Sequence, residues 1–110
     1  ALNLKKFFND LIILEWGKFP DFDMIINATS LGLSKNDNFG IDFIKLGINK
    51  FYYDVIYEPC ETEFFKAGNI DGNIYENGFN MFLFQAQKAF NIWHNIQPNI
   101  NEEVVKFIRS

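Results

Sequence analysis

Short apolar runs recur along the chain and are separated by polar or breaker-rich segments. Residues 11–14, 23–29 and 51–57 form runs of strand length, and a briefer run lies at 73–75. The second run is nearly continuous in apolar residues, as in a strand of a parallel sheet covered on both faces. We therefore predict four short strands.

Stretches between and after these runs have helical patterns. The predicted helices lie at 1–8, 41–46, 62–66, 78–94 and after Asn101. Thr62, Asn77 and Asn101 offer side-chain oxygens suited to helix caps, and a turn is expected at Asp71-Gly72. The alternation of strands and helices predicts an α/β fold built on a parallel sheet.

Composition and charge narrow the classes of protein. The chain has 110 residues, enough for one small domain, and 48% are hydrophobic against 22% charged, which is typical of a folded core. A net charge of −4 argues against nucleic-acid binding. With Cys60 and His94 the only residues of their types, no disulfide framework or zinc site is expected within one chain, and a reducing cytoplasm fits. No apolar run is long enough for a membrane span.

Candidate chemistry lies at the carboxyl ends of the predicted strands, where ligands collect in doubly wound sheets. The second strand leads into the small polar segment 27–30, the third ends at Tyr57, and the fourth ends at Asn77 and Gly78 before a helix. Backbone N–H groups at such a helix start favour electron-rich ligand atoms. Taken singly, each is better explained as a turn, a half-buried anchor or a helix cap.

Gln85 is harder to explain as a surface residue. Its neighbours on the predicted helix, Met81, Phe82 and Ala89, are apolar, and a buried amide costs a few kcal/mol unless it is hydrogen-bonded. We therefore expect Gln85 to have a hydrogen-bond partner: a backbone group, another side chain or a ligand. No Gly-rich phosphate loop and no metal site are found in the sequence.

Three segments together match one family in order and spacing. Residues 23–33 (DMIINATSLGL) resemble the Asn-Ala-Thr-Ser-x-Gly-Met segment of shikimate dehydrogenases. Residues 53–59 (YDVIYEP), with Thr62 behind them, resemble the family's Tyr-Asp-x-x-Tyr-x-Pro…Thr stretch. Residues 77–94 resemble its Gly-x-x-Met-Leu-x-x-Gln-Ala…Phe…Trp ending, although Asn80 stands where Gly is usual. The resemblance covers essentially the whole chain.

The resemblance implies the carboxy-terminal part of an enzyme of aromatic amino acid (chorismate) biosynthesis. The implied fold is an incomplete doubly wound (Rossmann-like) parallel sheet of three to four strands with flanking helices. Residues 1–78 would complete an NADP-binding domain, and residues 79–110 would return toward the substrate domain. The implied reaction is hydride transfer between NADP and the carbon that is a ketone in 3-dehydroshikimate and an alcohol in shikimate.

The resemblance also implies roles for seven residues. The cofactor-binding residues would be Thr29, Ser30, Val55, Gly78 and Met81, and the substrate-binding residues would be Tyr57 and Gln85. The family's catalytic Lys and Asp pair and its Gly-rich loop are expected upstream of Ala1, so no catalytic residue is named and the chain alone is expected to be inactive.

Two consequences and two alternatives complete the expectation. The apolar sheet edge left open by the missing strands predicts self-association. A non-catalytic α/β binding or interaction module would keep Tyr57 and Gln85 as packing residues, and a relative acting on quinate as well as shikimate is a further alternative.

Overall fold

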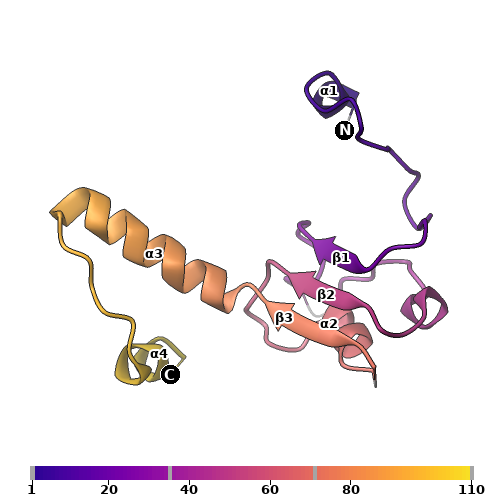
Figure 1. Cartoon of the computed structure of the whole chain (residues 1–110). Coiled ribbons are helices and arrows are strands. Elements are labelled where there is room, and N and C mark those ends of the chain that lie inside the picture. The colour runs from indigo at the N-terminus through magenta and orange to yellow at the C-terminus, as the bar shows by residue number, and fades with distance from the viewer. Residues whose placement is uncertain (1, 35, 71, 110) are drawn as a thin grey trace.

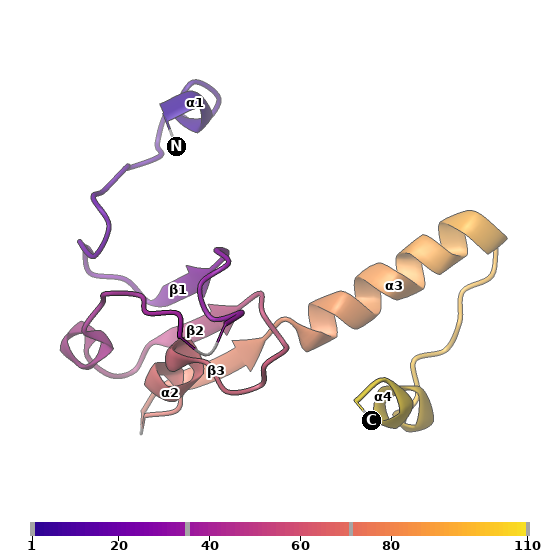
Figure 2. The same cartoon turned by 180° about the vertical axis from the view of Figure 1, so that it is seen from behind.

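The computed structural model describes residues 2–34, 36–70 and 72–109. In chain order its elements are α1 (Leu2–Lys5), β1 (Met24–Asn27), the 3-10 helix η1 (Phe43–Leu46), β2 (Phe51–Asp54), α2 (Glu63–Gly68), β3 (Ile74–Asn77), α3 (Phe79–His94) and α4 (Glu102–Arg109). The three strands form one sheet from which α3 extends outward, and α1 and α4 lie at the ends of extended segments (Figures 1 and 2).

The sheet is parallel and has the order β1-β2-β3. Its register pairs Met24 with Phe51 and Phe51 with Ile74, and one end of the sheet is the row Asn27, Asp54 and Asn77. Chain order and spatial order coincide, with η1 and α2 in the two connections. These strands confirm the predicted α/β fold and its three-stranded minimum.

One face of the sheet carries an aromatic core. Phe64 of α2 packs against Tyr52 of β2 with ring centroids 5.2 Å apart, and against Phe43 and Phe39 at 5.6 and 5.9 Å. Both Phe64 and Tyr52 are almost completely buried. Burial of large aromatic side chains on this face is the main force that holds α2 and η1 to the strands.

The prediction that both faces of the sheet are covered is wrong for the described residues. Side chains of a strand alternate between faces, and the face opposite α2 leaves Met24, Ile26 and Ile74 between 51% and 66% exposed. The sequence pattern reports apolar side chains on both faces but not which element lies over them.

The segment 11–14 is not a strand, contrary to prediction. It runs as irregular chain, with Ile12 and Leu14 largely exposed. An apolar run becomes a strand only beside another strand that satisfies its backbone groups, and no described strand lies next to this one. Similarly, the helix predicted over 1–8 is a single turn, Leu2–Lys5.

Two of the three predicted caps are confirmed. The Thr62 hydroxyl accepts a hydrogen bond from the Phe65 backbone N–H at 2.9 Å, and the Asn101 amide oxygen accepts one from Val104 at 3.0 Å. The third differs by one residue, because Gly78 occupies the cap position of α3 while the Asn77 oxygen accepts from the first helical N–H, that of Phe79, at 3.1 Å. In the predicted 71–72 turn, Asp71 lies outside the described residues.

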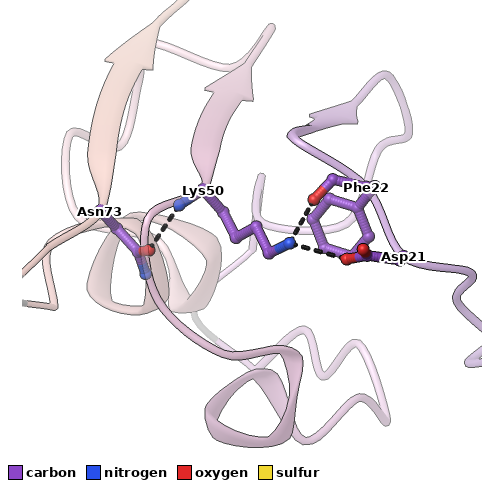
Figure 3. Close-up of polar contacts among 4 residues, drawn as sticks. All are labelled: Asp21, Phe22, Lys50 and Asn73. Atoms are coloured by element: carbon purple, nitrogen blue, oxygen red, sulfur yellow. Dashed lines mark hydrogen bonds and ion pairs between the residues drawn. The ribbon is translucent and has the colours of Figure 1, made fainter.

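Lys50 joins the starts of all three strands (Figure 3). Its ammonium donates to the Phe22 carbonyl and forms an ion pair with Asp21 at 3.0 Å, just before β1. Its backbone N–H, at the start of β2, donates to the Asn73 side chain at 3.0 Å, just before β3. The ammonium also lies 5.1 Å from the centre of the Phe22 ring. We call this set of contacts the Lys50 clamp.

Replacing Lys50 with methionine is expected to destabilise the chain by about 1 kcal/mol, mainly through loss of the hydrogen bond to the half-buried Phe22 carbonyl. The Asp21 carboxylate is fully exposed, so Asp21→Asn serves as the matched control and should change stability much less. Urea unfolding of both variants measures the difference. Equal effects of the two substitutions would contradict the assignment.

Candidate functional site

The carboxyl end of the sheet is organised by a buried carboxylate that the sequence analysis did not single out. Asp54, at the end of β2, is completely buried. Its Oδ1 accepts hydrogen bonds from the Asn27 side chain and the Ile56 backbone N–H, both at 3.0 Å, and its Oδ2 accepts from the Thr62 hydroxyl at 3.1 Å. The signal was present, since a lone Asp in an apolar strand must be buried and bonded.

The polar groups of Thr29 are engaged in hydrogen bonds within the loop that follows β1. Its hydroxyl donates to the Asn27 Oδ1 at 2.7 Å and accepts from the Leu31 backbone N–H at 3.1 Å, and its own N–H also donates to Asn27. The hydroxyl proton is therefore not available to a ligand in this arrangement. The neighbouring Ser30 is exposed and retains its hydroxyl for that purpose.

Val55 and Gly78 lie in direct backbone contact. A Cβ built on Gly78 would overlap the Val55 carbonyl oxygen and would lie 3.1 Å from the Val55 Cα. The backbone of Gly78 has φ −71°, which any residue adopts, so the need for glycine is one of space alone. Two residues predicted to touch the same ligand are thus side by side.

Tyr57 lies beside the first turn of α3. Its ring stacks on that of Phe82, with centroids 5.0 Å apart, and packs at a steep angle against Phe79 at 6.2 Å. An open hollow of about 450 Å³ borders Tyr57, and its other lining residues are Glu58, Cys60, Asn77, Phe79, Ile108 and Arg109. The Arg109 guanidinium lies over the Phe79 ring at 4.3 Å. Met81, on the same helical turn, is half-buried.

Gln85 is not buried on an apolar face, contrary to prediction. Gln85 is exposed, because α3 projects away from the sheet and no described element covers this part of it (Figure 1). It is the sixth residue after Phe79, the start of α3, which places it about 9 Å along the helix axis. The structure therefore groups Thr29, Ser30, Val55 and Gly78 at one end of the sheet and sets Gln85 apart.

Asn80, where the family usually has glycine, does not fill this site. Its side chain is exposed and donates to the Glu76 carboxylate at 2.8 Å. The substitution therefore leaves the contact between Val55 and Gly78 intact.

Burial changes the proton affinity of two groups near the carboxyl end. Loss of hydration raises the pKa of Asp54, and the three hydrogen bonds that it accepts oppose this only in part. Burial, assisted by the negative charge of Asp54, raises the pKa of Tyr75 to about 12. The Tyr75 hydroxyl is buried and finds no hydrogen-bond partner among the described residues. At neutral pH it remains protonated.

The raised pKa of Asp54 predicts how the stability of the chain depends on pH at acidic values. The folded chain binds this proton at a higher pH than the unfolded chain, so Asp54 makes stability increase as the pH falls from the raised pKa toward the ordinary value of 3.8. Asparagine does not titrate, so the Asp54→Asn variant lacks this pH-dependent contribution to stability. The stability of the natural chain relative to Asp54→Asn is therefore expected to rise on acidification.

Urea unfolding of both chains from neutral pH down to about pH 4 measures this difference. Carboxyls whose pKa is lowered, such as Asp37 through its hydrogen bonds from Ser34 and Gly32, act in the opposite direction but cancel between the two chains. A relative stability that falls on acidification would contradict the prediction.

Neither a metal site nor a membrane helix is found in the described part of the chain. No three potential metal-binding side chains of Asp, Glu, His or Cys gather there. None of its helices has the length and apolar character needed to cross a membrane.

Sequence relatives and solved structures agree with this geometry. The chain is 49% identical over 108 residues to the shikimate dehydrogenase (NADP(+)) of Pelagibacter ubique, a match that takes in 98% of this chain and 41% of the relative. No protein-family model matches. The chain thus spans about two fifths of the length of this curated relative.

Two solved structures share the fold. A shikimate dehydrogenase from Listeria monocytogenes, in complex with shikimate and NAD, matches with TM-score 0.64 and 26% identity over 80% of this chain and 30% of its own. A shikimate dehydrogenase in complex with NADP+ matches with TM-score 0.61 and 34% identity over 70% of this chain and 28% of its own.

Proposed function

Because the chain belongs to the shikimate dehydrogenase family over the part of those enzymes that it spans, we propose that it forms the nicotinamide end of an NADP-dependent active site. The reaction is hydride transfer between shikimate and 3-dehydroshikimate. The observation that carries the proposal is the junction of Val55, Gly78 and Tyr57, which places a backbone wall and a phenol at the carboxyl end of a parallel sheet. Acting alone, the chain is inactive.

The residues present fit the nicotinamide end of the cofactor and not its phosphates. The backbones of Val55 and Gly78 lie against each other and form a wall of main-chain atoms, and the half-buried Met81 follows Gly78 in the first turn of α3. The exposed Ser30 hydroxyl offers a polar contact, whereas Thr29 acts by holding the turn that presents Ser30. Bound NADP supplies the hydride acceptor.

Tyr57 and Gln85 recognise the substrate. The Tyr57 ring is held by stacking on Phe82, which directs its hydroxyl without using it. Gln85 remains exposed on α3, so its amide is free to bind a substrate hydroxyl once the rest of the site faces it. Neither residue moves a proton in this scheme.

The division of the chain follows from the same arrangement. Residues 1–78 contribute to the cofactor domain, and residues 79–110 return toward the substrate domain. Phe84 and Trp93 on α3 are 62% and 76% exposed, as expected of a helix that packs on another part of the protein. We place the protein in the cytoplasm, where its exposed Cys60 stays reduced.

Self-association of the isolated chain is expected through the β1 edge. β1 lies at one side of the sheet, and Met24 and Ile26 on it are more than half exposed. Such an edge pairs readily with a second copy. Sedimentation of the purified chain tests this, and a single monomeric species at all concentrations would overturn it.

A chimera tests the proposed activity. In it, this chain replaces the matching segment of the Pelagibacter ubique relative, and shikimate-dependent formation of NADPH is measured. Activity is expected in the chimera and none in the 110-residue chain alone. Tyr57→Phe and Gln85→Ala should each lower kcat/KM for shikimate by about tenfold or more, the effect of one lost substrate hydrogen bond.

A neighbouring glutamine provides the control. The Gln87 amide donates to the Pro98 carbonyl at 2.8 Å and so has a structural partner on the chain. Gln87→Ala should leave kcat/KM for shikimate unchanged. A folded but inactive chimera would overturn the proposed function and favour a non-catalytic binding module.

A further inference from the structure

The buried carboxylate of Asp54 lies at the carboxyl end of the sheet but has so far been given no role in ligand binding. We propose that Asp54 is the positioning residue of the cofactor wall: it fixes, through hydrogen bonds, the two loops that carry Ser30 and Val55. The inference rests on the proposed function, because it is the nicotinamide end whose geometry Asp54 would set. It does not require Asp54 to touch cofactor or substrate.

Three separate segments converge on this one side chain. The Asn27 amide ends β1, the Ile56 N–H begins the loop after β2, and the Thr62 hydroxyl begins α2. All three groups donate, and the carboxylate accepts from each. Since Asp54 is fully buried, no solvent competes for these bonds.

From Asn27 the bonding continues to the predicted cofactor contacts. The Asn27 amide nitrogen also donates to the Leu31 carbonyl at 3.0 Å, and its oxygen accepts from both the N–H and the hydroxyl of Thr29. The loop 28–31 is thereby closed around the Asn27 side chain. Because Asp54 holds that side chain in place, a change at Asp54 is transmitted to Ser30, which lies inside the loop.

The second loop is held more directly. The Ile56 carbonyl accepts from the Gly78 N–H at 3.4 Å, and the Ile56 N–H donates to Asp54. The Ile56 N–H belongs to the same planar peptide unit as the Val55 carbonyl, so its bond to Asp54 fixes the orientation of that carbonyl against Gly78. The wall formed by Val55 and Gly78 therefore depends on Asp54 through one intervening bond.

A carboxylate suits this position better than an amide. An asparagine here keeps one oxygen for Asn27 and Ile56 but turns its NH₂ group toward the Thr62 hydroxyl. That hydroxyl already accepts from the Phe65 N–H, so its own proton loses its acceptor. Asp54→Asn therefore preserves the size of the side chain and two of its bonds while removing the third.

The Lys50 clamp supplies a matched control. Lys50 precedes β2 and Asp54 is its last residue. The Lys50 clamp lies at the starts of the strands (Figure 3), whereas the site lies at their carboxyl ends. A variant at Lys50 should destabilise the protein without altering the cofactor wall. Comparing the two separates positioning from general stability.

The test uses the active chimera with Asp54→Asn or Lys50→Met. Asp54→Asn is expected to raise KM for NADP by about tenfold, the factor that corresponds to one hydrogen bond to a charged group. Lys50→Met is expected to lower the melting temperature with KM for NADP unchanged. An unchanged KM for NADP in Asp54→Asn, or an equal rise in Lys50→Met, would overturn the inference.

A second measurement keeps the inference testable if the chimera is inactive and the proposed function fails. In the 110-residue chain, the Leu31 amide donates to the Thr29 hydroxyl, and Asp54 is linked to this loop through Asn27. Hydrogen exchange of the Leu31 amide therefore reports how firmly the loop is held. Asp54→Asn should accelerate that exchange about tenfold. Lys50→Met should change it by no more than its effect on the free energy of global unfolding accounts for. Equal exchange at Leu31 in the natural chain and in Asp54→Asn would overturn the positioning role itself.

Discussion

Replacing Gly78 with alanine is expected to destabilise the chain by about 4 kcal/mol or more, since overpacking at an immobile contact belongs to the most damaging class of substitutions. The added methyl group would overlap the Val55 carbonyl oxygen, a main-chain atom that cannot rotate away. The junction of β3 and α3 would have to separate from the loop after β2. Loss of the cooperative thermal transition in circular dichroism is the expected observation.

Gly40→Ala is the control for this substitution. Gly40 has φ +64°, and a methyl group there would meet nothing within 4 Å. Its cost is therefore conformational only, about 1 kcal/mol for alanine in the left-handed region. If Gly78→Ala melted like Gly40→Ala, the close approach of Val55 and Gly78 would be refuted.

Phe64→Ala is expected to destabilise the chain by about 3–5 kcal/mol, the usual cost of deleting a buried aromatic ring. Phe64 is 2% exposed and its ring contacts those of Phe39, Phe43 and Tyr52. Because no described element covers the opposite face of the sheet, few other contacts can compensate. Urea unfolding followed by circular dichroism should show loss of most of the stability.

The neighbouring Phe65 offers a matched comparison. It is only partly buried and makes one ring contact, with Tyr75 at 4.9 Å. Phe65→Ala should therefore cost clearly less than Phe64→Ala, because less apolar surface returns to water. A larger effect at Phe65 than at Phe64 would place the core elsewhere.

Local signals in the sequence predicted the parts of the fold that depend on local bonds. The caps at Thr62 and Asn101 need only a hydroxyl or amide and an N–H three residues on, and both form as expected. The segment 11–14 did not become a strand because a strand also needs a neighbour, which its own residues do not specify. The uncovered face of the sheet escaped prediction for the same reason.

In the candidate site too, some features were expected from the sequence, whereas those that depend on tertiary packing were not. Val55 and Gly78 were expected near one another because the family resemblance implies that both touch the nicotinamide end of the cofactor, and their backbones are in contact. The burial of Gln85 was inferred from neighbours on one helix, but burial depends on what packs over that helix. Asp54 was overlooked because its burial depends on the fold, which brings the Asn27 side chain, 27 residues away in sequence, to the same carboxylate as the Ile56 N–H and the Thr62 hydroxyl.

Because of the contact between Val55 and Gly78, the exposed surface of α3 and the position of its base can change independently during evolution. The base of α3 is held there by a main-chain contact and by the packing of Phe79 and Phe82 on Tyr57, all within its first turn. Mutations can therefore alter the exposed residues Phe84 and Trp93 and still leave the helix aimed as before. Selection on the surface that α3 presents can then proceed independently of selection on the wall at its base.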